Sequence, residues 1–190
     1  KIFLEAQKKW VFTLDAPVSW GDVGAQNGTL SIMVWGEEHI FQKILPLFEL
    51  MWKSIVYCGE AGMWQHTKMA NQISIAWNTI ALCESLLYSE KIWLDMEKTI
   101  QIISGWAAGS WGWNNLAPRI VKWELDTCFF IKHFLKDLRI VLDECRTMNI
   151  YLPGLSLVEW LYTIAYNKGK QNLWTQALID VLREINSSQS

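Results

Sequence analysis

The chain has 190 residues, of which 51% are hydrophobic and 19% charged, and its formal net charge is −2. This length allows one sizeable domain, or a small domain with part of another. The charge gives no electrostatic reason to expect nucleic acid, and no apolar run is long enough to span a membrane.

The first 58 residues alternate between strand and helix patterns. Residues 1–9 are typical of the end of a helix, since Lys8 and Lys9 suit its C-terminus. Short strands are predicted over 11–14, 29–34 and 54–58, with an amphipathic helix over 37–50. The small loop over 15–21 can expose backbone N–H groups. This is α/β material, but too little to close a doubly wound sheet alone.

Beyond residue 58 the pattern is helical. Gly59 and Gly62 mark a turn before a long helix that continues to about Lys91. Its apolar stripe has helical spacing: Met69, Ile73, Ile80, Cys83 and Leu87. Further helices are predicted over 95–103, 118–123, 129–148, 155–167 and 173–185, with a loop over 104–115 and Asp95 as a cap. We therefore expect a mainly α chain, in which residues 1–58 are the remnant of an α/β domain and residues 59–190 form an all-helical domain.

The long helix carries a polar group near its start. Lys68, Asn71 and Gln72 are spaced i, i+3 and i+4, which places an ammonium and two amides on one helical face. A bound anion or carbonyl is one partner for such a group. A solvated first turn is the alternative that this stretch alone favours.

The sequence gives little support for disulfide, metal-binding or phosphate-binding chemistry. Four cysteines are scattered without a CxxC pair: Cys58, Cys83, Cys128 and Cys145. Free thiols in a reducing compartment are the simplest interpretation, which predicts a cytoplasmic protein. Three histidines lie far apart, without ligand spacing, so no metal site is expected: His39, His66 and His133. The chain also has no GxGxxG fingerprint and no P-loop.

The chain contains 13 tryptophans, an unusual number, and several occupy positions where a backbone favours glycine. Five stand out: Trp20, Trp35, Trp64, Trp93 and Trp106. Either the protein carries these indoles, as a decayed or engineered variant, or one codon was translated as Trp where its host reads Gly. The second hypothesis is favoured because every one of these positions has tryptophan where glycine is expected.

Three ordered motifs carry a family resemblance. They are Asp15-Ala16-Pro17-Val18-Ser19-x-Gly21, then Gly59-x-x-Gly62 followed by Lys68-x-x-Asn71-Gln72, and finally Lys136-Asp137-Leu138. In order and spacing they resemble the β-hydroxyacid dehydrogenase family, which includes 3-hydroxyisobutyrate dehydrogenase, tartronate semialdehyde reductase and the glyoxylate/succinic semialdehyde reductases. The likeness covers nearly the whole chain, and it is specific for the family but weak for the substrate.

The resemblance implies a role for each matched residue. Lys68 corresponds to the catalytic lysine that exchanges a proton with the substrate oxygen, and Asn71 to the amide that holds the substrate. Ser19, with the backbone N–H groups of Trp20 and Gly21, corresponds to the loop that binds the substrate carboxylate. Lys136 corresponds to the lysine that reaches the cofactor, NAD or NADP, near its nicotinamide. Hydride transfer is then the cofactor's chemistry, and the protein supplies a proton, an anion site and orientation.

The resemblance also defines what differs. Three more tryptophans stand where the family pattern implies glycine: Trp52, Trp77 and Trp174. The family begins with a dinucleotide-binding domain that carries a GxGxxG loop, so this chain is expected to be a C-terminal fragment, inactive alone, with a 6-phosphogluconate dehydrogenase-like helical domain. A homodimer or homotetramer built through that domain is expected. The alternative is a catalytically dead helical dimerisation module, and an imine-reducing relative is a third possibility. The substrate and the choice between NAD and NADP stay open.

Overall fold

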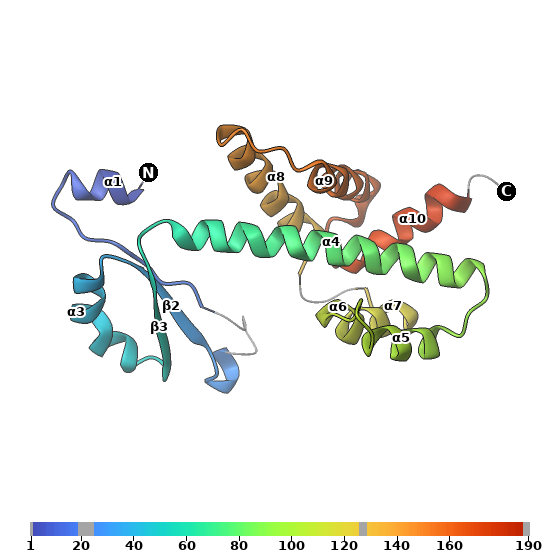
Figure 1. Ribbon diagram of the computed structural model, residues 1–190, viewed down its shortest axis with the longest axis horizontal. Helices are drawn as coiled ribbons and strands as arrows, with labels where there is room; N and C mark the ends of the chain where they lie inside the picture. The colour runs from blue at the N-terminus through green and yellow to red at the C-terminus, as the bar shows by residue number, and fades with distance from the viewer. Residues whose placement is uncertain (1, 19–24, 126–128, 188–190) are drawn as a thin grey trace. The chain divides into compact units, whose positions relative to one another are not determined.

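The chain forms two compact units, Lys1–Lys68 and Met69–Ser190, called here the sheet unit and the helical unit. The structure is a computed structural model that describes residues 2–18, 25–125 and 129–187. Helices account for most of these residues, and a single small sheet is present in the described part (Figure 1). The predicted mainly α chain with a small sheet is confirmed.

The sheet unit contains a three-stranded sheet in the order β1-β2-β3. β1 (Leu14–Asp15) pairs antiparallel with β2 (Ser31–Gly36), and β2 pairs parallel with β3 (Ser54–Gly59). A parallel pair needs a crossover connection, which α3 (Glu38–Glu49) supplies, while α1 (Ile2–Gln7) precedes the sheet. The buried centre of this unit is a small cluster of Ile32, Val34 and Phe41.

The first strand is shorter than its sequence suggests and lies further along the chain. The β-rich run over 11–14 predicted a strand, but the strand that pairs with β2 is confined to Leu14 and Asp15. Val11 and Phe12 are exposed by 53% and 55%. β-branched and aromatic residues favour strands only where a neighbouring strand and a packed face are available. Val11 and Phe12 have no such partner, because the pairing with β2 begins at Leu14.

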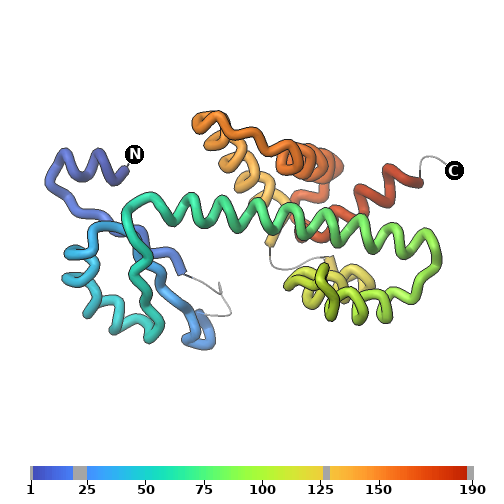
Figure 2. Tube along the Cα trace, in the orientation of Figure 1, coloured from blue at the N-terminus to red at the C-terminus, as the bar shows by residue number. Residues whose placement is uncertain are grey.

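The helical unit is organised along α4 (Met63–Lys91), a helix of 29 residues whose first six belong to the sheet unit. Its other helices are α5 (Met96–Ser104), α6 (Trp111–Asn115), α7 (Ala117–Val121), α8 (Ile131–Thr147), α9 (Pro153–Ala165) and α10 (Leu178–Ser187). After α4 the chain turns back on itself into α5 (Figure 2). One continuous apolar cluster joins α4 to helices on both of its sides.

Polar links fix α10 against α4. The Arg183 guanidinium is bonded to both carboxylate oxygens of Glu90, and its Nε–Oε2 distance is 3.0 Å. The same guanidinium also donates to Asp180 at 3.1 Å. These neighbouring carboxylates raise the pKa of Arg183 against the opposing effect of its partial burial. The pairs set the register of α10 along α4.

The predicted helices are present, with three corrections at their boundaries. The helix predicted over 173–185 is α10, which begins only at Leu178, after a short 3-10 helix over Thr175–Ala177. The stretch over 104–115 was predicted as a loop, but its end forms α6, which Ser110 caps by accepting from the Trp113 N–H at 3.4 Å. The predicted helix over 155–167 begins at Pro153 instead, because proline is well suited to the first helical turn. Asp95 caps α5 as expected and accepts from the Lys98 N–H at 3.1 Å.

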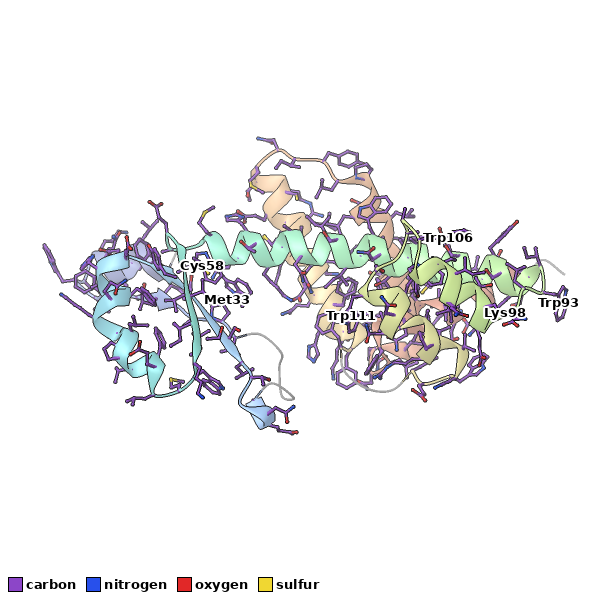
Figure 3. All side chains as sticks on the ribbon, turned by 60° about the horizontal axis from the view of Figure 1, so that its bottom comes forward. Met33, Cys58, Trp93, Lys98, Trp106 and Trp111 are labelled. Carbon is purple, nitrogen blue, oxygen red and sulfur yellow. The ribbon has the colours of Figure 1, made fainter. Side chains whose placement is uncertain are left out.

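Three tryptophans have the left-handed backbone conformation that favours glycine. These are Trp10, Trp93 and Trp123, with φ of 58°, 61° and 58°. The prediction is therefore confirmed at Trp93, whose side chain lies at the turn after α4 (Figure 3), whereas Trp10 and Trp123 were missed.

Most of the other tryptophans named from the sequence do not share this backbone conformation. Six of them have no positive φ: Trp35, Trp52, Trp64, Trp77, Trp106 and Trp174. Trp77 instead makes a close approach, because a Cβ built on Gly154 of α9 would lie 1.7 Å from its ring. Trp20 lies outside the described residues.

Candidate functional site

The first three turns of α4 carry Lys68 and Asn71, three residues apart on one continuous helix. Both are exposed. The turn before this helix is bounded by the two glycines that the sequence places there. Gly59 and Gly62 have φ of 114° and 91°, conformations that side chains with a Cβ rarely adopt.

Gln72 departs from the single polar face that its spacing with Lys68 and Asn71 predicted. Its residue is only 1% exposed, whereas Lys68 and Asn71 lie on the surface. Its Oε1 accepts a hydrogen bond from Asn71 Nδ2 at 3.1 Å, and its Nε2 donates to Asp137 Oδ2 at 2.8 Å. A buried amide is costly without such partners. The three polar residues therefore divide between the surface and the interior.

Lys136 and Asp137 lie on α8 at the far end of this hydrogen-bonded chain. The Lys136 ammonium is 2.8 Å from Asp137 Oδ1, while Asp137 Oδ2 accepts from Gln72. The Asp137 side chain is 17% exposed and that of Lys136 is 64% exposed. An ion pair with so exposed a lysine contributes little stability. Its effect is geometric, because the carboxylate fixes where the ammonium lies.

The helical unit thus brings together two of the residues named from the sequence, Asn71 and Lys136, through two partly or fully buried side chains. Asp137 belongs to a sequence motif, but the motif by itself indicates no more than a partner for Lys136. The sequence carries only a weak signal for the hydrogen bond between Asp137 and Gln72. That signal is the occurrence of two polar side chains among apolar neighbours on helices that pack together.

Ser19, Trp20 and Gly21 lie outside the described residues, so their expected role stays a prediction. The segment before them is fixed. Met33 N–H donates to the Pro17 carbonyl at 3.0 Å, and Val18 forms an antiparallel bridge with Ile32.

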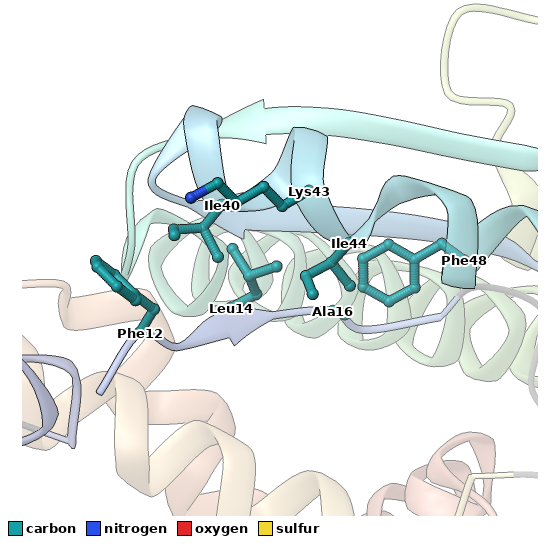
Figure 4. Close-up of a pocket in the computed structure, with 7 residues that line it drawn as sticks. All are labelled: Phe12, Leu14, Ala16, Ile40, Lys43, Ile44 and Phe48. Carbon is teal, nitrogen blue, oxygen red and sulfur yellow. The ribbon is translucent and has the colours of Figure 1, made fainter. Parts of the chain in front are cut away.

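A hollow in the sheet unit has a different character. It measures about 540 Å³ and lies between α3 and β1. Figure 4 shows its lining of Phe12, Leu14, Ala16, Ile40, Lys43, Ile44 and Phe48. None of the residues named for catalysis or binding lines it. Its one ionisable group, Lys43, lies at the edge of an apolar surface, which offers no chemistry beyond packing.

The Cys83 thiol does not suit nucleophilic chemistry, and the described part of the chain has no group of residues suited to a metal ion. Burial raises the pKa of the Cys83 thiol to about 12, so this sulfur is not a thiolate near neutral pH. Within residues 2–18, 25–125 and 129–187, no group of three His, Cys, Asp or Glu could hold a metal ion. Over the same ranges, every helix is too short or too polar to cross a bilayer.

Two family models match adjacent parts of the sequence. Residues 62–182 match the model described as NAD-binding of NADP-dependent 3-hydroxyisobutyrate dehydrogenase. Residues 1–59 match the model described as the NAD binding domain of 6-phosphogluconate dehydrogenase.

Individual relatives agree with these matches. An uncharacterized oxidoreductase of Bacillus subtilis, YkwC, is 47% identical over 94% of this chain. A probable 3-hydroxyisobutyrate dehydrogenase-like protein of Arabidopsis thaliana is 43% identical over 96% of it. The chain spans 62% and 54% of the lengths of these two proteins. The solved structure of Mycobacterium tuberculosis 3-hydroxyisobutyrate dehydrogenase with L-serine has a TM-score of 0.84 at 27% identity, over 96% of this chain and 65% of that one.

Proposed function

Because this chain belongs to the β-hydroxyacid dehydrogenase family, we propose that it is the C-terminal part of an NAD(P)-dependent oxidoreductase. The reaction interconverts a small β-hydroxyacid and its semialdehyde or keto acid. Residues 1–58 are then the end of an NAD(P)-binding Rossmann domain, and 59–190 the substrate and oligomerisation domain. The names of the relatives support a small hydroxylated carboxylate as substrate, as does the L-serine that accompanies the Mycobacterium tuberculosis enzyme in its solved structure.

One observation carries this proposal. Lys68 and Asn71 are exposed one turn apart on α4, and Asn71 is connected to the α8 lysine, Lys136, by hydrogen bonds through buried side chains. A proton-transfer group, an amide and a second cation are therefore available on neighbouring elements. A purely structural helix would not require this set.

Lys68 supplies the acid or base. In the oxidising direction a neutral Lys68 amine takes the proton from the substrate hydroxyl while the carbon gives up a hydride. In the reducing direction the Lys68 ammonium returns a proton to the carbonyl oxygen. Asn71 orients that oxygen by hydrogen bonding. This orientation matters because proton transfer is fast only when the reacting atoms are held close together in the correct geometry.

The cofactor supplies the hydride acceptor or donor when it is bound. The residues present fit one end of it: the Lys136 ammonium is exposed, is held by Asp137 and can donate to an oxygen of the cofactor. The loop over 19–21 would bind the substrate carboxylate through Ser19 and backbone N–H groups of Trp20 and Gly21. A cytoplasmic location suits the scattered cysteines.

The deciding experiment is the substitution Lys68→Ala in the complete protein that contains this chain. Turnover of 3-hydroxyisobutyrate and related β-hydroxyacids should be lost, while the Kd for NAD(P) stays within a few-fold of the parent. Lys98→Ala is the matched control, since Lys98 is an exposed lysine on α5. Near-normal turnover by Lys68→Ala would refute the acid/base role.

A homodimer or homotetramer is part of the same proposal. The helical unit exposes large apolar side chains on α4 and α9, including Trp77, Leu157 and Trp160 at 53%, 52% and 55%. Exposed apolar groups of this size favour an interface. Light scattering on the complete protein measures the assembly directly. If it assembles but no β-hydroxyacid is turned over, the alternative of a helical dimerisation module is favoured.

A further inference from the structure

The hydrogen-bonded chain between α4 and α8 contains one polar side chain that has no assigned role. Gln72 is 1% exposed, so its amide is removed from water. It contacts Asn71 with one end and Asp137 with the other, at 3.1 and 2.8 Å. An apolar side chain would fill this position without the requirement for polar partners. The amide is therefore a specific feature of the interior.

The contacts have a direction that orients their neighbours. Gln72 Oε1 accepts one N–H of the Asn71 amide, which restricts the rotation of that amide. Gln72 Nε2 donates to Oδ2 of Asp137, so Oδ1 is the oxygen that contacts the Lys136 ammonium. Each end of the Gln72 amide thus determines the orientation of a different surface group.

We propose that Gln72 is a positioning residue that couples the substrate-binding amide of Asn71 to the cofactor-binding ammonium of Lys136 through Asp137. This inference rests on the proposed function for the roles of Asn71 and Lys136. Gln72 itself contacts neither substrate nor cofactor. Its effect reaches the reaction through the geometry of the two groups, where small displacements are costly in rate.

The substitution Gln72→Glu tests the coupling with almost no change of shape. In its protonated form the new carboxyl can still donate to Asp137 and accept from Asn71. Once it ionises, two carboxylates lie at hydrogen-bond distance, which is unfavourable and raises the pKa of the pair. The kcat/KM of Gln72→Glu should therefore be near that of the parent at low pH. It should fall on the order of tenfold below the parent as the pH rises through a range of about 5 to 8.

The matched control is Gln101→Glu, because Gln101 is exposed on α5. Circular dichroism at each pH checks that the variants stay folded. A merely structural role would lower the unfolding temperature but leave the pH profile of kcat/KM parallel to that of the parent. A parallel profile for Gln72→Glu would overturn the proposal.

A second measurement does not depend on turnover. In the Gln72→Leu variant of the complete protein, the side-chain amide NMR signals of Asn71 should shift and exchange faster with water, while Gln101→Leu leaves them unchanged. Unchanged Asn71 signals in Gln72→Leu would refute the positioning role. If the parent fails to turn over any β-hydroxyacid while these signals do shift, the proposed function fails and the positioning of Asn71 stands.

A different observation, at the helix ends, carries a second inference. After α1, α4 and α7 the chain closes with the same pair of backbone bonds, of which one spans five residues: Val11 to Ala6, Leu94 to Ser89 and Glu124 to Arg119, at 3.0, 3.0 and 2.9 Å. This is the Schellman geometry, which requires a left-handed residue just before the last donor. Those residues are Trp10, Trp93 and Trp123.

The fourth such ending shows which residue types normally fit. After α8, Ile150 N–H donates to the Cys145 carbonyl at 2.9 Å, and the left-handed residue is Asn149, with φ of 55°. Asparagine tolerates this conformation and glycine adopts it freely. Tryptophan gains nothing from it at Trp10 and Trp93, whose side chains are 91% and 92% exposed.

We infer that the natural polypeptide carries glycine at positions 10, 93 and 123, where this sequence has Trp10, Trp93 and Trp123. One codon read as tryptophan in place of glycine accounts for all three. Tandem mass spectrometry of the protein from its native source tests each position separately. Peptides lighter by one tryptophan-to-glycine difference at all three positions would support the inference. Peptides with tryptophan at any of them would overturn it.

Discussion

The two units of this chain differ in how much apolar surface they enclose. The helical unit buries one continuous cluster drawn from all of its long helices, including Leu82, Phe134 and Tyr162. The central cluster of the sheet unit contains three buried residues, and large apolar groups such as Val56 and Leu50 stay exposed. A small sheet with one packed helix is marginal on its own. The stability of the described chain therefore resides mainly in the helical unit.

The same difference extends to the candidate site. Asn71, Gln72, Asp137 and Lys136 all belong to the helical unit, where packed helices hold them in a hydrogen-bonded chain. Lys68 is the last residue of the sheet unit, although it lies on the same helix as Asn71. The residues of the site that belong to the helical unit are therefore held in place by packed helices.

Thiol reactivity should show the largest contrast between the units. Cys58 lies half-buried in β3 (Figure 3), whereas Cys83 is fully buried in α4 and its pKa is raised to about 12 by burial. Only the thiolate reacts, so an alkylating reagent at neutral pH should modify Cys58 at least about 100-fold faster than Cys83. Peptide mapping separates the sites. Equal native rates would contradict the contrast, and the rates should converge in denaturant.

A matched pair of core truncations should show the next largest effect. Ile179→Ala in α10 and Ile32→Ala in β2 remove the same atoms from side chains that are 0% and 2% exposed. The cost of a cavity depends on how far its surroundings can collapse. We expect a loss of unfolding free energy of about 4 kcal/mol at Ile179 but about 2 kcal/mol at Ile32. Urea titrations followed by circular dichroism measure both, and equal losses would mean that the two cores are equally rigid.

Glycine at a helix end should stabilise the helical unit modestly. A non-glycine residue in the left-handed conformation costs about 1–2 kcal/mol. Glycine avoids this strain, but it loses more conformational entropy on folding, which offsets part of the gain. We expect Trp93→Gly to raise the unfolding free energy by about 0.5–1 kcal/mol, or Tm by about 2–4 °C. Asn149→Gly is the control, since asparagine already tolerates its φ of 55°. A fall in Tm on Trp93→Gly would show that the indole contributes to packing there.

The sequence predicted the helical unit better than the sheet unit, for a physical reason. A stripe such as Met69, Ile73 and Ile80 reports a local periodicity that the packed helix preserves. The extent of β1 depends on which residues find a partner strand, and Val11 and Phe12 do not. Long-range pairing of this kind leaves little trace in a short apolar run.

The candidate site was predictable only in part. The positions of Lys68, Asn71 and Lys136 were predicted from motif spacing. That Gln72 is buried and bonded to Asp137 could not be, because it depends on the rotation of α4 against α8. Trp10 and Trp123 were missed for a related reason. Their left-handed backbone follows from where each helix ends, and helix ends are the least certain feature of a sequence pattern.

The smallest expected effect concerns the cap of α5. Backbone N–H donation by Lys98 is the largest of the causes that hold the pKa of Asp95 below its ordinary value of 3.8. A lowered pKa stabilises the fold above the unfolded-state value, and this stabilisation is lost as the pH falls through the lower folded-state value. Asp95→Ala should therefore lower Tm at pH 7, and the deficit should shrink as the pH falls below 3.8. Asp95→Asn keeps an acceptor without the charge, so its Tm difference from Asp95→Ala should be independent of pH. A deficit for Asp95→Ala that persists unchanged into acid would show that the carboxylate charge makes no contribution to the end of the helical unit where α5 begins.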